Sequence, residues 1–350
     1  MEEKIFTGVL DDPRSELDQE KKWTHEELFG SGGFDWKEIP EADWPTYPIR
    51  NQNGSGKCGP FSGVFALGRN EEKENGKFVL LDTDYPYSFR SNEGTGMWMD
   101  NLFQILCSKG SFPDPDMLSD NGTDAQSAER AKNFTDEEKA DALKYRGKSW
   151  VYITDKNINS IAQAITMCYT PIYLMRCNIK EWTAEPFVDP NITQDQYDIN
   201  HFIPAYLPTL WKGFQSTVVN DSWGSHYGRN GRRILSKDFI EKRVFYIGYV
   251  IDLKNENIDK PKHLFTSPLT YGMEGPEVTA WQQILQYEKY LPTHTLAGAP
   301  LPLGKFLSMT AQATRKWQIA HGIMDFSEEK DIKKIRVGKK SIALANNLYQ

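Results

Sequence analysis

The sequence predicts an α+β protein with a helical lobe, then a β-rich lobe, and finally a small all-α three-helix bundle. Residues 58–110 carry apolar side chains at helical spacing, whereas residues 149–253 contain short runs rich in Val, Ile and aromatic residues, as strands do. Helical patterns return near the C-terminus, after a polar stretch that contains Lys, Asn and Pro. A helical lobe beside a β-rich lobe leaves a natural cleft, where a functional site is expected.

Two segments predict the helices of the first lobe. Residues 58–67 ("CGPFSGVFAL") place their large apolar side chains on one face, and residues 97–110 ("MWMDNLFQILCSKG") form a second apolar helix that ends at glycine. Residues 111–148 are rich in Asp, contain proline and are charged. We expect them to connect the lobes across the surface, with helical structure around "DEEKADALKY".

Short apolar runs predict the strands of the second lobe. In chain order they are "SWVYI", "CYTPIYLMRC", "STVVND", "RRILS" and "VFYIGYVIDL".

Three helices are predicted in the C-terminal region. Pro276 suits the first position of a helix whose apolar face carries Val278, Trp281, Ile284 and Leu285. A second helix is expected to begin at Thr310, a good N-cap, and to run to His321 before Gly322. The segment "KSIALANNL" supplies the third.

These patterns divide the chain into four parts. Residues 1–44 are polar and are expected to form an arm or short leader, and residues 45–253 form the two-lobe domain. Residues 254–267 read as a linker, and residues 268–350 read as a small independent helical domain.

Composition and charge exclude several classes of partner. The chain has 350 residues, of which 39% are hydrophobic and 13% aromatic, which is enough to build globular cores. Its formal net charge of -7 gives no general attraction to nucleic acid or to an anionic membrane, so neither is expected as a partner. The basic stretch 330–340 is a local exception, interpreted as a solvated surface.

No targeting or membrane segment is visible in the sequence. No window approaches 18 consecutive apolar residues, and the N-terminus is acidic where a secretory signal would be basic and then apolar. We therefore predict a cytoplasmic protein as made, released by lysis or carried in a virion. The four cysteines show no CxxC spacing and no dense disulfide framework, so no metal, no cofactor and a reducing compartment are expected.

The segment "QNGSGKC" places Cys58 behind a run of small residues at a predicted helix start. Unpaired backbone N–H groups at a helix start favour negative charge and therefore a thiolate. Catalysis by a cysteine also needs a histidine, a group that orients the histidine, and donors for the oxyanion. The candidates are Gln52 as oxyanion donor, His201 as base, and the polar pair Asn220 and Asp221 as orienting group.

These residues give the chain a resemblance to the papain-like cysteine peptidases, from about residue 35 to residue 253. That family has Gln six residues before the catalytic Cys, a distant His in an apolar strand, and then Asn-Ser-Trp-Gly. The segment "NDSWGSHYGRNGRRIL" matches this last motif together with the family's glycine-rich turn and the strand after it. The resemblance implies a two-lobe fold, peptide hydrolysis, and a tryptophan, here Trp223, that shields the histidine. It also implies that Gly96 pairs with substrate backbone, so Gly96 and Trp223 are the predicted substrate-side residues.

The sequence departs from the family pattern at three places. Alignment on Ser-Trp-Gly puts Asp221 where the family has Asn, and an aspartate can still accept the histidine N–H. Asn220 would serve instead if the strand register differed by one residue. Ser55 stands in the place of a structural half-cystine, and Pro60 and Phe61 follow where the family usually has Trp directly after the cysteine.

Several polar residues have alternative interpretations. His226 is a rival base, although it lies in the glycine-rich turn beyond the Ser-Trp-Gly motif. Cys107, Cys168 and Cys177 are expected to pack as small hydrophobic side chains.

The C-terminal helices resemble the peptidoglycan-binding domain found beside many cell-wall hydrolases. The matching residues are Leu269, Gly272, Gly275, Val278, Trp281, Gln282, Leu285, Gly304, Phe306, Thr310, Trp317, Gln318, Gly322 and Ile323. The resemblance implies peptidoglycan as a partner, although a matching fold pattern does not by itself fix the ligand.

The function predicted from the sequence is peptide-bond hydrolysis by a thiol peptidase that its C-terminal domain directs to bacterial cell wall, with a phage or phage-like origin. A first alternative is a general protein-degrading peptidase whose C-terminal module binds protein. A second alternative is an inactive papain-like protein with a structural or binding role, for example in a virion.

Overall fold

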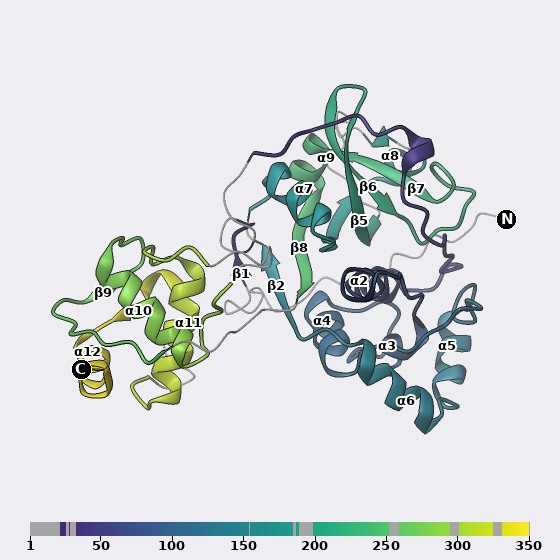
Figure 1. Cartoon of the computed structure of the whole chain (residues 1–350). Helices are drawn as coiled ribbons and strands as arrows, with labels where there is room; N and C mark the ends of the chain where they lie inside the picture. Colours follow the sequence, from purple (N-terminus) through teal and green to yellow (C-terminus); the bar gives the residue numbers. More distant parts are fainter. Residues whose placement is uncertain are drawn as a thin grey trace. The chain divides into compact units, whose positions relative to one another are not determined.

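The computed structural model describes residues 22–25, 28, 33–153, 155–184, 187–188, 199–251, 259–294, 301–324 and 331–349. These residues fall into two compact units (Figure 1). Within the described residues, the first unit runs from 33 to 251, and the second takes in 22–25, 28 and 259–349. The first unit combines helices with a β-sheet, which confirms the predicted α+β class.

The helices of the first unit begin with α2, a helix of 18 residues from Cys58 to Asn75. Figure 1 shows α2 to α6 gathered on one side of this unit, with α7, α8 and α9 beside the sheet. The further helices are α3 (Asp84–Ser88), α4 (Met99–Ser108), α5 (Asp124–Ala131), α6 (Asp136–Ala142), α7 (Ile158–Thr166), α8 (Ile179–Ala184) and α9 (Lys237–Arg243), with short 3-10 turns η2 (Glu41–Asp43) and η3 (Leu143–Tyr145).

The strands of the first unit lie in the order β2-β8-β3-β5-β6-β7-β4. Neighbours are antiparallel except for β4 and β7, which are parallel. Their bounds are β2 (Ser149–Ile153), β3 (Ile172–Cys177), β4 (Phe187–Val188), β5 (Ile199–Trp211), β6 (Phe214–Asn220), β7 (Arg232–Ser236) and β8 (Val244–Ile251). The long strands β5 and β6 form a hairpin, which brings residues near 201 and 221 together.

Residues 33–44 do not behave as a separate arm. Trp36 Nε1 donates to Asn159 Oδ1 at 2.7 Å, and the backbone N–H of Leu210 donates to Lys37 O at 2.8 Å. Trp44 is buried in a core cluster with Tyr206 of β5. The apolar and aromatic side chains of this segment therefore fold onto the first unit, where the sequence suggested an arm through residue 44.

Residues 111–148 contain the helix expected around "DEEKADALKY", which is α6 (Asp136–Ala142), but they are more than a surface connection. They contain two helices, α5 and α6, each begun by a threonine capping box, at Thr123 and Thr135. Asp114 and Ser119 are buried, because their side chains bond to each other and to Arg50, close to the start of α2. The many carboxylates of this segment therefore serve buried ion pairs as well as solvation.

The second unit contains the helices α10 (Pro276–Tyr287), α11 (Ser308–Ala320) and α12 (Lys339–Tyr349) and a 3-10 turn η4 (Ile332–Lys334). Its strands β9 (Leu269–Thr270) and β10 (Arg336–Val337) pair with each other. The short strand β1 (Lys22–Trp23) also belongs to this unit. Its core contains Trp281 and Trp317, whose ring centroids lie 4.9 Å apart. Helix α11 begins two residues before the expected N-cap. Thr310 therefore lies inside the helix, where it is buried and accepts from Gln282 Nε2 at 2.7 Å.

The described residues contain neither a membrane-spanning helix nor a metal-binding cluster. None of the helices there is both long enough and apolar enough to span a lipid bilayer. Nor does this part of the chain hold a group of three or more His, Cys, Asp or Glu side chains placed to bind a metal ion.

Candidate active site

Cys58 is the first residue of α2, and its side chain is fully buried. The segment before it runs beside the residues that come after β6. The backbone N–H of Gln52 donates to Ser222 O at 2.8 Å, and that of Gly224 donates to Arg50 O at 3.0 Å. These bonds hold the approach to Cys58 against the end of the β5–β6 hairpin.

His201 and Asp221 are joined by a buried hydrogen bond. His201 lies in β5, Asp221 follows β6, and His201 Nε2 is 3.0 Å from Asp221 Oδ1. Asn220 points elsewhere, since its Nδ2 donates to Pro48 O at 3.2 Å. Of the two candidate orienting residues, Asp221 is therefore the one bonded to the histidine.

Cys58 also influences His201. Burial lowers the pKa of His201, but hydrogen bonding and charge from Asp221 and Cys58 outweigh it and raise the pKa to about 9. His201 Nδ1 is buried and has no hydrogen-bond partner of ordinary length among the described residues. This nitrogen is therefore available to take a proton from the thiol, as catalytic hydrogen bonds are often long before substrate binds.

Both oxygens of Asp221 are occupied. Oδ1 also accepts from the Ser222 backbone N–H at 2.8 Å, and Oδ2 accepts from Arg233 Nε at 2.6 Å and from Trp182 Nε1 at 3.2 Å. Burial raises the pKa of this carboxyl, but Arg233 and His201 outweigh burial and hold the pKa at about 2. Asp221 is therefore a carboxylate at neutral pH.

Two tryptophans enclose the His201–Asp221 pair. The ring centroid of Trp223 lies 5.5 Å from that of His201, and the ring centroid of Trp182 lies 5.8 Å from it. Trp223 is only 7% exposed. These positions suit the exclusion of water from the hydrogen bond, and leave Trp223 little surface for the substrate contact predicted for it.

Gln52 is buried beside Ser222 and the loop that leads to Cys58. Its Oε1 accepts from Ser222 Oγ at 2.6 Å, and its Nε2 donates to Ser55 O, also at 2.6 Å. Ser55, in the place of the expected half-cystine, donates its hydroxyl to Gln52 O at 2.6 Å. These hydrogen bonds join Gln52 to Ser55 and close the loop that leads to Cys58. The Gln52 amide nitrogen points toward this loop.

This arrangement can be set beside known proteins, although no family model matches the chain. A region of 194 residues, 55% of this chain, is 23% identical to cathepsin K of Mus musculus, and it spans 56% of that protein, about half its length. The solved structure of xylellain, a cysteine protease from Xylella fastidiosa, has a TM-score of 0.52 at 12% identity, over 65% of this chain and 97% of that one. The chain has the papain-like cysteine protease fold.

The papain-like fold confirms what the resemblance implied about architecture. The glycine expected to pair with substrate backbone does not fit that role. Gly96 is buried, its N–H donates to Tyr87 Oη at 2.9 Å, and its carbonyl accepts from Asn92 Nδ2 at 3.0 Å. Both polar groups of its backbone are therefore already paired.

Gly96 nevertheless lies directly beside the loop that leads to Cys58. A Cβ added at Gly56 would come within 2.2 Å of both Gly96 N and Thr95 Oγ1. No side chain larger than hydrogen fits there, so the glycine before Lys57 is required by close backbone approach.

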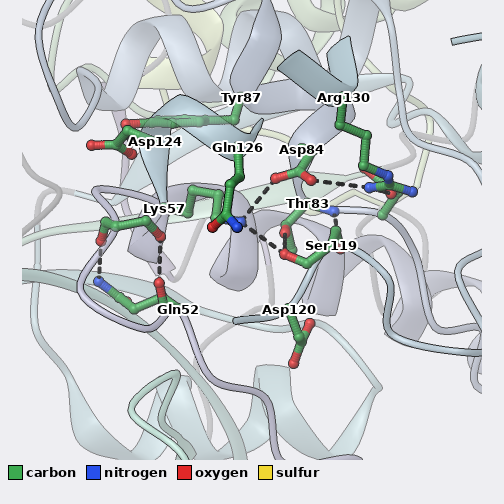
Figure 2. Close-up of polar contacts among 12 residues, drawn as sticks. Gln52, Lys57, Thr83, Asp84, Tyr87, Ser119, Asp120, Asp124, Gln126 and Arg130 are labelled. Atoms are coloured by element: carbon green, nitrogen blue, oxygen red, sulfur yellow. Dashed lines mark hydrogen bonds and ion pairs between the residues drawn. The ribbon is translucent and has the colours of Figure 1, made fainter. Parts of the chain in front are cut away.

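A buried ion-pair network, which the sequence did not predict, supports this loop. Lys57 Nζ is fully buried and lies 2.8 Å from both Asp84 Oδ1 and Ser119 O (Figure 2). Arg130 of α5 contacts the other oxygen of Asp84 at 3.0 Å and also pairs with Asp82. Burial raises the pKa of Asp82 to about 6, against the opposing charge of Arg130.

Further carboxylates hold the backbone of the same loop. Asp120 accepts from Arg50 Nε at 2.7 Å and from the Asn51 N–H at 3.1 Å, and Asp124 accepts from the Gly56 N–H at 3.1 Å. Figure 2 shows Asp124 next to Tyr87, whose hydroxyl donates to it at 2.9 Å. Residues 84–130 therefore fix the approach to Cys58 from one side.

The remaining titratable candidates lie outside this arrangement. His226 occupies the turn after Trp223, whereas the contacts of Asp221 go to His201. Cys177 is buried, and Cys107 and Cys168 are partly buried. The sequence did not mark Arg233 and Trp182, because long-range packing brings them to Asp221: Arg233 through the pairing of β7 with β6, and Trp182 from helix α8.

Proposed function

We propose that this protein is a cysteine peptidase in which Cys58 is the nucleophile, His201 the general base and acid, and Asp221 the orienting residue. The observation that carries the proposal is the His201 Nε2–Asp221 Oδ1 bond of 3.0 Å beside a cysteine at the start of α2. A peptide or protein is the corresponding substrate.

The proposed reaction begins with transfer of the Cys58 proton to His201 Nδ1. The thiolate attacks the scissile carbonyl, and the negative oxygen of the tetrahedral intermediate is held by Gln52 Nε2 and the Cys58 backbone N–H. The imidazolium gives its proton to the leaving amine, which departs and leaves an acyl-enzyme. A water molecule, deprotonated by His201, then releases the acid and restores the thiol.

The surroundings of His201 favour this chemistry. An imidazolium beside Asp221 is the form that pairs with a thiolate, and the raised pKa of about 9 keeps it protonated at neutral pH. Cys58 and His201 are both fully buried, so groups above them must move before a polymer can reach the sulfur. A small alkylating reagent is consequently the better first probe.

We further propose that the second unit directs the enzyme to peptidoglycan. The support is its resemblance to peptidoglycan-binding domains, together with the burial of pattern residues Trp281, Phe306 and Trp317. Tethering would raise the local enzyme concentration at an insoluble polymer without changing the catalytic site.

The deciding experiment combines thiol labelling with product analysis. Iodoacetamide at neutral pH should modify Cys58 far faster than Cys107, Cys168 or Cys177 in the full chain. New amino termini should then be identified by mass spectrometry after incubation with purified peptidoglycan and with a denatured protein. Cleavage of protein alone favours the general peptidase, whereas an unreactive Cys58 with no cleavage favours the inactive binding protein.

A further inference from the structure

Arg233 is an unusually placed cation beside the proposed site. It lies in β7, is fully buried, and donates Nε to Asp221 Oδ2 at 2.6 Å. Its guanidinium lies over the Trp182 ring, with Cζ 4.5 Å from the centroid, and Nη1 donates to Trp182 O. Stacking and two hydrogen bonds fix the guanidinium plane, which a lysine could not reproduce.

The charges around the site explain why a cation is needed there. Cys58, His201, Asp221 and Arg233 are each no more than 2% exposed, so solvent screens them little. A thiolate and an imidazolium cancel, and an ionised Asp221 alone would then leave one net negative charge in the buried site. The positive charge of Arg233 neutralises this negative charge. With an uncharged asparagine at position 221 the negative charge would not arise.

We propose that Arg233 is a positioning residue of this site: with Asp221 it forms a neutral, rigid pair that replaces an uncharged orienting amide. This inference rests on the proposed peptidase function. The strongest charged neighbours of His201 are Asp221 and Cys58, and those of Asp221 are Arg233 and His201. The two members of the Asp221–Arg233 pair therefore have opposite effects on the thiolate–imidazolium pair.

The proposal changes the expected behaviour of Asp221→Asn. The sequence alone suggests that this change restores the family residue and gives an active enzyme. In the structure, Asp221→Asn leaves Arg233 as a buried cation without a carboxylate partner. This should strongly destabilise the folded protein. Asp221→Asn combined with Arg233→Met removes both charges and should recover most of the lost melting temperature.

The pH profile of Cys58 alkylation by iodoacetamide separates this role from simple packing. Arg233→Met removes a positive charge and makes the site more negative. Both the acid and the alkaline limb of the profile should therefore shift to higher pH by about one unit. Asp221→Asn adds net positive charge and should move them down, and the double variant should return them close to wild type. Arg233→Lys keeps the charge, so it should keep the limbs while lowering the melting temperature.

Arg69→Met is the matched control. Arg69 is also a buried arginine, 2.6 Å from Glu72 and over the Tyr47 ring, and its charge is paired with Glu72 and not with Asp221. Its loss should lower the melting temperature and leave the limbs in place.

Two outcomes overturn the inference. The first is that the double variant is no more stable than Asp221→Asn. The second is that the pH profiles of Cys58 alkylation stay in place in the variants that change the charge. If Arg233→Met fails to fold, the comparison of Asp221→Asn, the double variant and Arg233→Lys decides by the same criteria. Failure of the proposed function looks different, because wild-type Cys58 would then react no faster than the other cysteines.

Discussion

Lys57 Nζ lies 2.8 Å from Asp84 Oδ1 in the interior of the first unit, one residue before Cys58. Removing one member of a buried ion pair leaves the other uncompensated and costs about 3–5 kcal/mol. Arg130 still contacts Asp84 and compensates part of its charge. We therefore expect Lys57→Met to lower the free energy of unfolding by an amount at the lower end of that range.

The same substitution should slow alkylation of Cys58, because Lys57 also holds the loop through Ser119 O. Urea unfolding and labelling rates measure the two effects. Lys139→Met is the control, since its exposed pair with Asp136 is worth at most about 1 kcal/mol. Equal stability of the two variants would show that the buried pair contributes nothing.

Cys58→Ala and His201→Ala should each abolish hydrolysis of a peptide, by about 10³-fold or more in kcat, because both belong to one proton-transfer unit. Both variants should keep a cooperative thermal transition. Activity within about tenfold of wild type in either variant would refute the assignment of that residue.

Gln52→Ala should act mainly on turnover, with a loss of about 10²-fold in kcat, as expected for one oxyanion donor. Ser222→Ala is the matched comparison, because Ser222 Oγ only fixes the Gln52 amide, at 2.6 Å. It should lose less than Gln52→Ala. A change confined to KM in the Gln52 variant would argue against the oxyanion role.

The alkaline limb of kcat/KM should lie near pH 9, because that is where His201 loses its proton. The pKa of His201 is raised from 6.5, so its stabilising contribution is complete below about 6.5 and disappears as the pH rises through about 9. The pKa of Asp221 is lowered from 3.8, so its contribution holds above 3.8 and disappears as the pH falls through about 2.

Urea unfolding across this pH range checks the sign of the His201 effect. Cys58→Ala removes one of the groups that raise the His201 pKa, so the fall in stability above about pH 6.5 should be smaller and should end at lower pH than in wild type. Identical curves would mean that Cys58 does not act on His201.

A chain of residues 33–251 should hydrolyse a soluble peptide nearly as fast as the full chain and should no longer sediment with peptidoglycan. The end point matters, because Phe265 is buried in the second unit, where its N–H donates to Asn346 Oδ1 at 2.8 Å. Cys58→Ala in the full chain is the control that keeps the second unit. If the truncated chain and the full-length Cys58→Ala variant sediment equally with peptidoglycan, the targeting proposal is wrong.

The sequence predicted the class of fold and most strands because these depend on local patterns. Runs such as "SWVYI" and "RRILS" became β2 and β7, and the apolar helix start at residue 58 became α2. The Cys58, His201 and Asp221 candidates came from the resemblance of their segments to the motifs of the papain-like family.

The features that the sequence could not predict depend on long-range pairing. Arg233 reaches Asp221 because β7 pairs with β6, opposing Val219 to Arg233. Lys57 meets Asp84 only after helix α3 packs against α2, and nothing in the isolated segment marks that lysine as buried. The acid-rich stretch 111–148 was a signal for another buried cation, because it supplies Asp114 and Asp120 as partners of Arg50.

All four cysteines are free thiols, and the Ser55 position holds a hydroxyl bonded to Gln52 O. Preparation of the protein is simpler for this reason. A reductant added during purification or storage keeps the Cys58 sulfur unoxidised and has no crosslink to break in the scaffold. Shelf life and activation can therefore be optimised under a single redox condition, and air oxidation, rather than reduction, is the hazard to guard against.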